Sequence, residues 1–266
     1  MRAIILSEMA ENPVSSISWA SSNTVKIGQL AKRIRRRAAF YARRPSIGAI
    51  DFGAFDRVRP ISRNWGFDRG LPIDRHYIEA FLSRHAGDVH GRVLEVADNH
   101  YTRQFGGDGV TQSDILYKGT DNPKATLHAD LTDAPEVPRD AFDCVICTQT
   151  LQFIFDLPAA IATIHSILRP GGVALVTLPS VSRVATPEMA AYGDYWRFTT
   201  ASAQRLFDDC FGEGNAAISS FGNVYAAVAF LHGLAAEDVD QGKLDLTDSN
   251  FQVLIAVRAT KGGRAA

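Results

Sequence analysis

The segment between residues 142 and 178 decides the fold. It reads FDCVICT at 142–148, PAAIATIHSIL at 158–168, RPGG at 169–172 and VALVTL at 173–178. The first and last pieces are short apolar runs, typical of strands that are buried on both faces. The second piece is typical of a helix, with Pro158 allowed in its first turn and the Pro-Gly-Gly sequence ending it. A strand, a helix and a strand in this order predict two parallel strands joined by a helical crossover.

Further short strands flank this unit. Strands are predicted at Gly91–Ala97, Val110–Leu116, Ala125–Ala129, Ala216–Phe221 and Phe251–Ala259, and helices at Pro72–Leu82, Ala201–Cys210 and Val224–Leu234. Residues 45–70 are punctuated by proline and glycine and are expected to be irregular. The sequence therefore predicts an α/β fold, a doubly wound and mainly parallel sheet of seven strands with helices on both faces. Ligands of such sheets bind at the carboxyl ends of the strands.

Three acidic residues fall at or near the predicted strands. Glu95 lies inside a strand, where a buried carboxylate is costly unless it is paired or faces a polar ligand. Asp114 follows Glu95 by 19 residues, close to the spacing of a carboxylate that accepts hydrogen bonds from ribose hydroxyls. Asp130 closes the Ala125–Ala129 strand. Together they predict a nucleoside site, although each could instead be a loop-edge carboxylate that caps a helix.

Four stretches in order carry a family resemblance. They are VLEV at 93–96, Asp130-Leu131, the strand and turn at 142–151, and LRPGGV at 168–173. Residues 91–178 resemble a class I S-adenosylmethionine-dependent methyltransferase, which implies a Rossmann-like methyltransferase fold. PIDR at 72–75, LEVADNHYT at 94–102, TQTL at 148–151 and GDYWRFT at 193–199 extend the likeness over about residues 60–261. This longer likeness is to bacterial methyltransferases found beside or joined to glycosyltransferases in surface-polysaccharide loci.

The resemblance implies S-adenosylmethionine as cofactor and gives roles to particular residues. Glu95 would orient the methionine amino group, Ala97, Asp98 and Asn99 would line the amino-acid end, and Asp114 would hold the ribose. Asp130 would accept from the adenine amino group, Leu131 would cover the ring, and Thr148 and Gln149 would lie under the cofactor. The chain departs from the family pattern after Val96, where ADNHY stands in place of the usual glycines. Asp and Asn tolerate a left-handed backbone, so this turn can still form.

An oxygen nucleophile benefits from a general base, and His100 is the histidine nearest the predicted cofactor turn. The alternative is a loop histidine that hydrogen-bonds to the backbone. Tyr195, Trp196 and Arg197 follow the last parallel strand and could contact a sugar ring. They could equally form a hydrophobic cluster, in which Arg197 pairs with Asp194.

Charge is unevenly distributed along the chain. The net charge is −1, yet residues 1–44 hold nine basic and two acidic residues, so the tail carries +7 and the remainder −8. Residues 27–41 show apolar positions at helical spacing with basic residues on the other arc, typical of a helix on an anionic membrane surface. The alternative is a solvated or disordered tail. We expect a basic extension at 1–44 and a methyltransferase domain at 45–266.

Composition narrows the remaining choices. With 46% hydrophobic and 21% charged residues the chain is globular, and no apolar run is long enough to span a bilayer. Cys144 and Cys147 alternate along a strand, so we expect two core residues, with no disulfide framework and no metal site. The acidic body makes a nucleic-acid partner unlikely, and a cytoplasmic protein is expected, with a possible peripheral position at the inner membrane face.

The sequence therefore predicts S-adenosylmethionine-dependent methyl transfer, with the acceptor a glycan hydroxyl or another surface-polysaccharide precursor. A small molecule could replace the glycan, and a glycosyltransferase is a possible partner. Two alternatives stay open. One is a non-catalytic domain that has lost cofactor affinity. The other is a nicotinamide-dependent oxidoreductase, for which no G-x-G-x-x-G follows the first strand.

Overall fold

The computed structural model describes residues 44–263, apart from the side chains of Pro187 and Glu188. The chain divides into two compact units, residues 1–56 and 57–266. Residues 44–56, the described part of the first unit, contain one short 3₁₀ helix, η1 (Gly53–Phe55). The basic helix predicted at 27–41 lies outside the described residues. No helix within residues 44–263 is long and apolar enough to cross a membrane.

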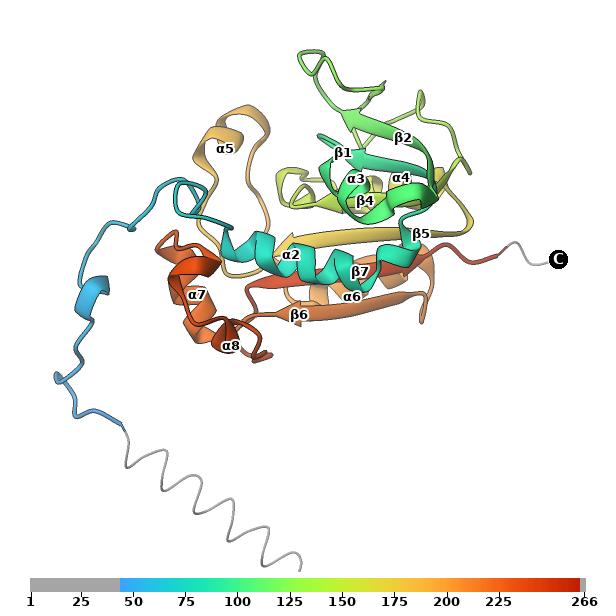
Figure 1. Ribbon diagram of the computed structural model, residues 1–266. Coiled ribbons are helices and arrows are strands. Elements are labelled where there is room, and N and C mark those ends of the chain that lie inside the picture. The colour runs from blue at the N-terminus through green and yellow to red at the C-terminus, as the bar shows by residue number, and fades with distance from the viewer. Residues whose placement is uncertain (1–43, 264–266) are drawn as a thin grey trace, which may run out of the picture. The chain divides into compact units, whose positions relative to one another are not determined.

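The second unit is built on a seven-stranded sheet (Figure 1) with the strand order β3-β2-β1-β4-β5-β7-β6. The strands are β1 (Gly91–Val96), β2 (Val110–Tyr117), β3 (Leu127–His128), β4 (Phe142–Thr148), β5 (Leu168–Pro179), β6 (Ala216–Phe221) and β7 (Leu254–Thr260). Strands β1 to β5 are parallel to one another, whereas β7 runs antiparallel to both β5 and β6. The predicted doubly wound, mainly parallel sheet is confirmed. Strand order reverses between β1 and β4.

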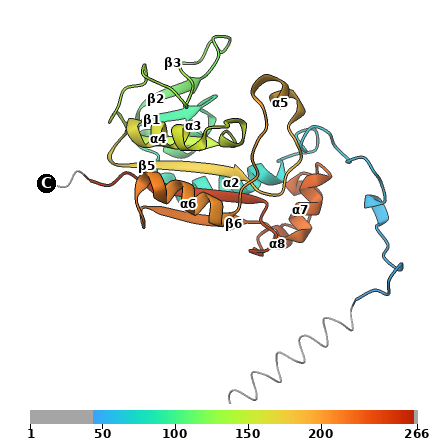
Figure 2. The same ribbon diagram turned by 180° about the vertical axis from the view of Figure 1, so that it is seen from behind.

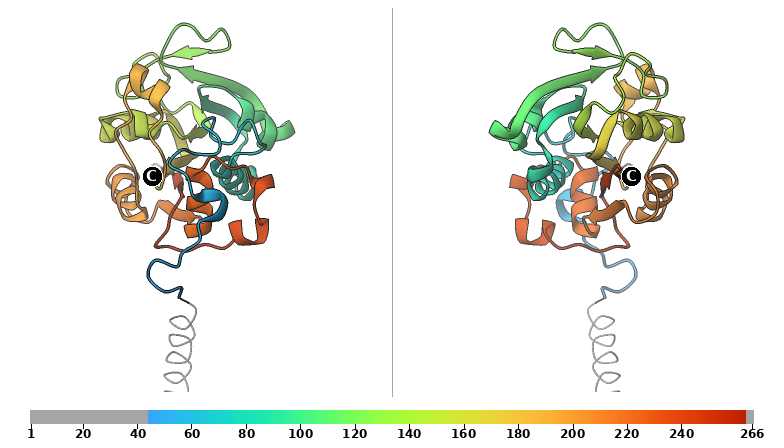
Figure 3. Two further views of the ribbon diagram at one scale, coloured as in Figure 1. Left: turned by 90° about the vertical axis from the view of Figure 1, so that its left-hand side faces the viewer. Right: turned by 90° about the vertical axis from the view of Figure 1, so that its right-hand side faces the viewer.

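Helices cover both faces of the sheet (Figures 1 and 2). The helices α4 (Leu157–Ile167) and α6 (Thr200–Phe211) lie on one face, and α2 (Ile73–Arg84) and α3 (His100–Gly106) lie on the other. The turned views of Figure 3 show the same separation. The remaining helical elements are α5 (Thr186–Tyr192), α7 (Val224–Leu231), α8 (Gln241–Leu244), η2 (Ala86–Asp88), η3 (Gly107–Gly109), η4 (Leu151–Phe153) and η5 (Ala236–Asp238).

The apolar runs form the core because the sheet is covered on both sides. Val145 and Cys147 of β4 pack in one cluster with Ile161 of α4 and Phe207 of α6, and all four side chains are fully buried. Cys144 is also buried, and both thiols are free. Alternation along β4 directs the two cysteines to opposite faces. The prediction that they are core residues is confirmed.

Local hydrogen bonds fix where the principal helices begin. The Asp156 side chain accepts from the Ala159 amide at 3.1 Å, which caps α4. Thr199 and Ser202 form a reciprocal capping box at α6. Asn223 caps α7 by accepting from the Ala226 amide at 3.0 Å. These side chains satisfy amides that have no partner within the helix, so each helix starts where a polar residue stands.

The bounds of three strands differ most from the sequence prediction. β3 has only two residues instead of the five predicted, β5 begins at Leu168 instead of Val173, and β7 begins at Leu254 instead of Phe251. The RPGG stretch at 169–172 lies within β5, where the Gly171 amide donates to the Lys261 carbonyl at 2.8 Å. A Cβ on Gly172 would approach the Phe142 carbonyl oxygen to 2.9 Å. These glycines therefore allow a close approach between strands in addition to ending α4.

Candidate functional site

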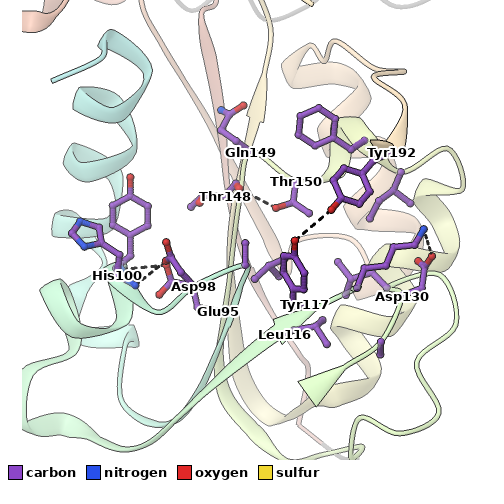
Figure 4. Close-up of a pocket in the computed structure, with 18 of the residues that line it drawn as sticks. Glu95, Asp98, His100, Leu116, Tyr117, Asp130, Thr148, Gln149, Thr150 and Tyr192 are labelled. Carbon is purple, nitrogen blue, oxygen red and sulfur yellow. Dashed lines mark hydrogen bonds and ion pairs between the residues drawn. The ribbon is translucent and has the colours of Figure 1, made fainter. Parts of the chain in front are cut away.

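A cavity of about 1000 Å³ opens at the carboxyl ends of β1, β2 and β4, where the strand order reverses. This volume is at the upper end of the range typical of small-molecule sites. Figure 4 shows how the strand ends line it: Glu95 and Asp98 come from the end of β1, Tyr117 from β2, and Thr148 and Gln149 from β4. The cavity occupies the position expected for the ligand of a doubly wound sheet.

Glu95 is the most deeply buried acid of the cavity wall, with 2% of its surface exposed. Its carboxylate accepts from the amides of Tyr101 (3.2 Å) and Thr102 (2.7 Å) and from the Thr102 hydroxyl (2.8 Å). Burial raises the pKa of Glu95 to about 7, against the hydrogen bonds from Thr102 and Tyr101, which lower it. The group can therefore gain or lose a proton near neutral pH.

Two residues at strand ends have a left-handed backbone although neither is glycine. Ala97 follows β1 with φ of 77°, and Gln149 follows β4 with φ of 48°. The Ala97 amide donates to the Leu116 carbonyl at 2.9 Å, and the Ala97 carbonyl accepts from the Asn122 side chain at 2.9 Å. Such a conformation costs on the order of 1–2 kcal/mol for a residue with a Cβ. The turn after β1 thus has a glycine-like conformation without glycine.

Of the next three residues, two line the cavity and one does not. The Asp98 carboxylate accepts from the His100 amide at 2.9 Å, and both residues line the cavity. Asn99 donates its side-chain amide to the Ser113 hydroxyl at 3.1 Å and is not part of the cavity lining. His100 begins α3 and is exposed, with its ring 5.2 Å from the Tyr101 ring. Of the predicted loop residues, Ala97, Asp98 and His100 meet at the cavity.

Asp130 and Leu131 line the cavity beyond β3. Asp130 pairs with Lys118 at 2.7 Å and accepts from the amide and hydroxyl of Thr132, both at 2.9 Å. Burial opposes ionisation of Asp130, but the hydrogen bonds from Lys118 and Thr132 outweigh it and lower the pKa of the carboxyl. Leu131 is 5% exposed. The structure thus presents an ionised carboxylate beside an apolar side chain.

Asp114 does not reach the cavity. Its carboxylate pairs with Arg92 at 2.7 Å and also accepts from Gln112 and Thr126, both at 3.0 Å. Asp114 is aligned with Leu94 in the middle of β1, whereas β2 continues to Tyr117. Three residues of strand span roughly 10 Å, so a carboxylate at this position lies well before the strand end. Asp114, which was predicted from its 19-residue spacing after Glu95, therefore lies within the sheet. Its position does not support the expected ribose role.

Of the predicted substrate residues Tyr195, Trp196 and Arg197, which follow α5, only the first lines the cavity. The Trp196 indole donates to the Ile154 carbonyl at 3.0 Å, and Arg197 pairs with Asp194 at 2.6 Å, so neither of these two side chains lines the cavity. Asp194 also accepts from the Ala185 amide at 2.9 Å. The alternative in which Arg197 pairs with Asp194 is confirmed, and this pair anchors the loop that carries Tyr195.

Arg75 is the residue at the site that sequence reasoning missed. It is the only arginine among the described residues that line the cavity, and its guanidinium hydrogen-bonds with the Tyr101 hydroxyl. The PIDR stretch contributed only to the family resemblance, because Arg75 comes from α2, far from the strand ends in sequence. Tyr117 was also missed, and its hydroxyl lies 3.5 Å from that of Tyr192 on α5.

Acids outnumber bases on the cavity wall. The acidic residues are Glu79, Glu95, Asp98, Asp130 and Asp156, and the lysine and arginine residues are Arg75 and Lys118. Since Lys118 already pairs with Asp130, most of the wall is negative and Arg75 provides a separate positive charge close to Asp98 and Tyr101. A ligand with positive groups and one anionic end suits this distribution of charge.

A comparison with protein families identifies one match. The profile of a family described as "Methyltransferase domain" matches residues 31–208, which is more than half of the chain. The match includes β1 to β5 and the greater part of α6. A comparison with curated proteins found no match.

Solved structures with a similar arrangement share little sequence with this chain. An S-adenosylmethionine-dependent methyltransferase from Archaeoglobus fulgidus is 11% identical, covers 70% of this chain and 94% of its own, and has a TM-score of 0.47. One from Mesorhizobium loti is 16% identical, covers 73% of this chain and 100% of its own, and has a TM-score of 0.47. The YcgJ protein of Bacillus subtilis is 12% identical, covers 70% of this chain and 99% of its own, and has a TM-score of 0.43.

Replacing Glu95 with Gln should change how stability depends on pH. The carboxyl titrates near 4.5 when unfolded and near 7 in the fold, so its protonated form is favoured by folding. Relative to Glu95→Gln, the wild type is therefore most stable below about pH 4.5 and loses that advantage as the pH rises to about 7. Urea unfolding at about pH 5 and about pH 8 should show the difference between the two proteins changing on the order of 2 kcal/mol. A constant difference would contradict the raised pKa.

Proposed function

The chain belongs to this methyltransferase-domain family and uses S-adenosylmethionine as methyl donor, and we propose that it methylates a hydroxyl of a glycan or another surface-polysaccharide precursor. The observation that carries methyl transfer is the acid-rich cavity at the ends of β1, β2 and β4. The glycan acceptor rests on the motifs at 72–75, 94–102, 148–151 and 193–199 and on the aromatic side chain of Tyr195 in the cavity wall.

The residues around the end of β1 fit the amino-acid end of the donor. When bound, S-adenosylmethionine supplies a methyl group on a positively charged sulfur, next to an ammonium and a carboxylate. In this proposal Glu95 accepts from the ammonium and the left-handed Ala97 lets the backbone approach it. Arg75 pairs with the carboxylate, because an arginine forms strong charge-assisted hydrogen bonds with such a group.

The residues beyond β2 and β3 suit a nucleoside. Asp130 accepts from the adenine amino group, and Leu131 covers one face of the ring. Tyr117 stands at the end of β2, where Asp114 was expected, and its hydroxyl can hydrogen-bond to the ribose. Thr148 and Gln149 form the floor at the end of β4, and Asp98 and Asn99 shape the loop around the amino-acid end.

Affinity for two ligands should identify the role of Arg75. We expect Arg75→Gln to weaken S-adenosylhomocysteine binding about 10- to 100-fold, since a hydrogen bond to a charged group contributes roughly 1.5–3 kcal/mol. Affinity for 5′-methylthioadenosine, which has no carboxylate, should stay unchanged. Both are measured by isothermal titration calorimetry.

Asp114→Ala is the matched control for this experiment. It leaves Arg92 unpaired within the sheet, so we expect a lower melting temperature and unchanged affinity for S-adenosylhomocysteine. The role of Arg75 would be contradicted if Arg75→Gln lost affinity for both ligands. It would also be contradicted if Asp114→Ala lost affinity for S-adenosylhomocysteine. No binding of S-adenosylhomocysteine to the wild type would refute the donor site itself.

His100 is the base that we propose for a hydroxyl acceptor, because it lines the cavity next to Asp98. We expect His100→Gln to lower kcat about 100-fold or more, the usual contribution of a positioned base. Its affinity for S-adenosylhomocysteine should match the wild type, because the backbone contact with Asp98 is retained. Unchanged turnover in His100→Gln would remove this residue from the reaction.

We propose a peripheral position at an anionic membrane, with a glycosyltransferase as a possible partner at that surface. The basic residues of 1–43 lie outside the described residues, but Ile47, Ile50 and Phe52 directly follow them and are highly exposed. Basic charge beside exposed apolar groups is typical of segments that bind membrane surfaces.

Flotation with liposomes tests the membrane proposal. The full chain should bind vesicles that contain phosphatidylserine and should lose this binding at high salt, since surface charges are screened. A chain that lacks residues 1–44 should float with the vesicles far less. Equal binding by the two chains would contradict the proposal, and vesicles of phosphatidylcholine alone are the control.

A further inference from the structure

A second, smaller cavity lies beside the first, at the carboxyl ends of β4 and β5. Its volume is about 210 Å³, below the usual range for drug-sized ligands and suited to one small group. The two cavities share part of their walls, which is formed by Phe67, Arg75, Gln149 and Phe153. The smaller cavity thus lies next to the donor site, on the side of β5.

Gln152 lines the smaller cavity and has a buried acceptor atom without a partner. The residue is 6% exposed, and its Nε2 donates to the Gln149 carbonyl at 2.8 Å, which fixes the orientation of the amide. Its Oε1 is buried and accepts no hydrogen bond from the described residues. An unsatisfied buried acceptor costs about 1–3 kcal/mol. A ligand that donates a hydrogen bond would remove this cost.

Asp74, in the first turn of α2, brings a second acceptor to the same cavity. Its Oδ1 accepts from the Arg75 amide at 2.9 Å, and burial raises the pKa of the carboxyl. Two acceptor side chains favour a ligand with several donors, such as hydroxyl groups.

The charged and aromatic side chains that line the smaller cavity further restrict the class of ligand that it can bind. Guanidinium groups come from Arg75, Arg183 and Arg197, and the carboxylates are Asp74 and Asp194. Arg197 and Asp194 pair with each other, so their charges cancel. The other charged lining residues are Arg75, Arg183 and Asp74, a balance that disfavours an ammonium ligand, while the acceptors of Asp74 and Gln152 disfavour an anion. The aromatic rings of Trp65, Phe67, Phe153 and Phe230 complete the wall and suit the apolar faces of a sugar ring.

We propose that this smaller cavity is the methyl-acceptor subsite, in which Gln152 and Asp74 accept hydrogen bonds from the hydroxyls of one uncharged sugar ring. The inference rests on the proposed function, because the adjoining large cavity must hold the methyl donor. Gln149 lines both cavities, so a ring held in the smaller cavity would lie next to the donor site.

Saturation-transfer NMR on the full chain loaded with S-adenosylhomocysteine tests the subsite. The probes are the methyl α-glycosides of glucose, mannose and rhamnose, with methyl glucuronide and glucosamine as anionic and cationic comparators. We expect a neutral glycoside to bind and the charged comparators to bind more weakly. Gln152→Leu removes the acceptor, and Ser182→Phe fills the cavity from the loop after β5. Each should weaken the neutral glycoside about tenfold or more.

Gln104→Leu is the matched control, since Gln104 is exposed on α3 and lines neither cavity. Melting temperature and affinity for S-adenosylhomocysteine are measured for every variant. The subsite is refuted if no neutral glycoside binds the wild type, if both cavity variants retain full binding, or if a charged comparator binds more tightly. If no glycoside binds while S-adenosylhomocysteine still does, only the subsite is refuted. If S-adenosylhomocysteine does not bind, the donor site is refuted.

Discussion

The contact between the Glu95 carboxylate and the first turn of α3 is the interaction on which the site depends. A helix begins with amides that have no partner inside it, and here a buried carboxylate from β1 accepts two of them, from Tyr101 and Thr102. The contact ties α3 to the sheet and forces the chain to turn within Ala97–Asn99. The left-handed Ala97 is a consequence of that short turn. Helix start, loop path and cavity wall are therefore determined together.

Sheet register explains why two buried acids of neighbouring strands have different surroundings. Glu95 is aligned with Ile115, one residue before the end of β1, and it lines the cavity. Asp114 is three residues before the end of β2 and is neutralised by Arg92. A buried carboxylate paired with a guanidinium mainly satisfies that charge, whereas a carboxylate that faces a cavity can still bind a ligand. In this sheet, position along a strand separates the acid that is paired within the sheet from the acid that lines the cavity.

The sequence was sufficient for the sheet but only partly for the site. β4 has the predicted bounds because an apolar run flanked by polar residues marks a buried strand. β6, a partly exposed edge strand, also has the predicted bounds. α3 was missed because its start is stabilised by Glu95, a tertiary contact that no local pattern shows. Arg75 was missed for a similar reason, since only the packing of α2 brings it to the strand ends. Residues within the strand-end motifs were predictable, and residues delivered by a packed helix were not.

The antiparallel direction of β7 has a practical consequence. Because β7 runs opposite to β5, its first residue, Leu254, pairs with Pro179 at the carboxyl edge, and its last, Thr260, pairs with Val173. Seven residues of strand span roughly 20 Å, so residues 261–263 leave the sheet at the edge opposite the two cavities. A fluorophore or a surface linker joined to these residues would leave both openings accessible. Attachment at this edge of the sheet therefore suits immobilised assays of the protein.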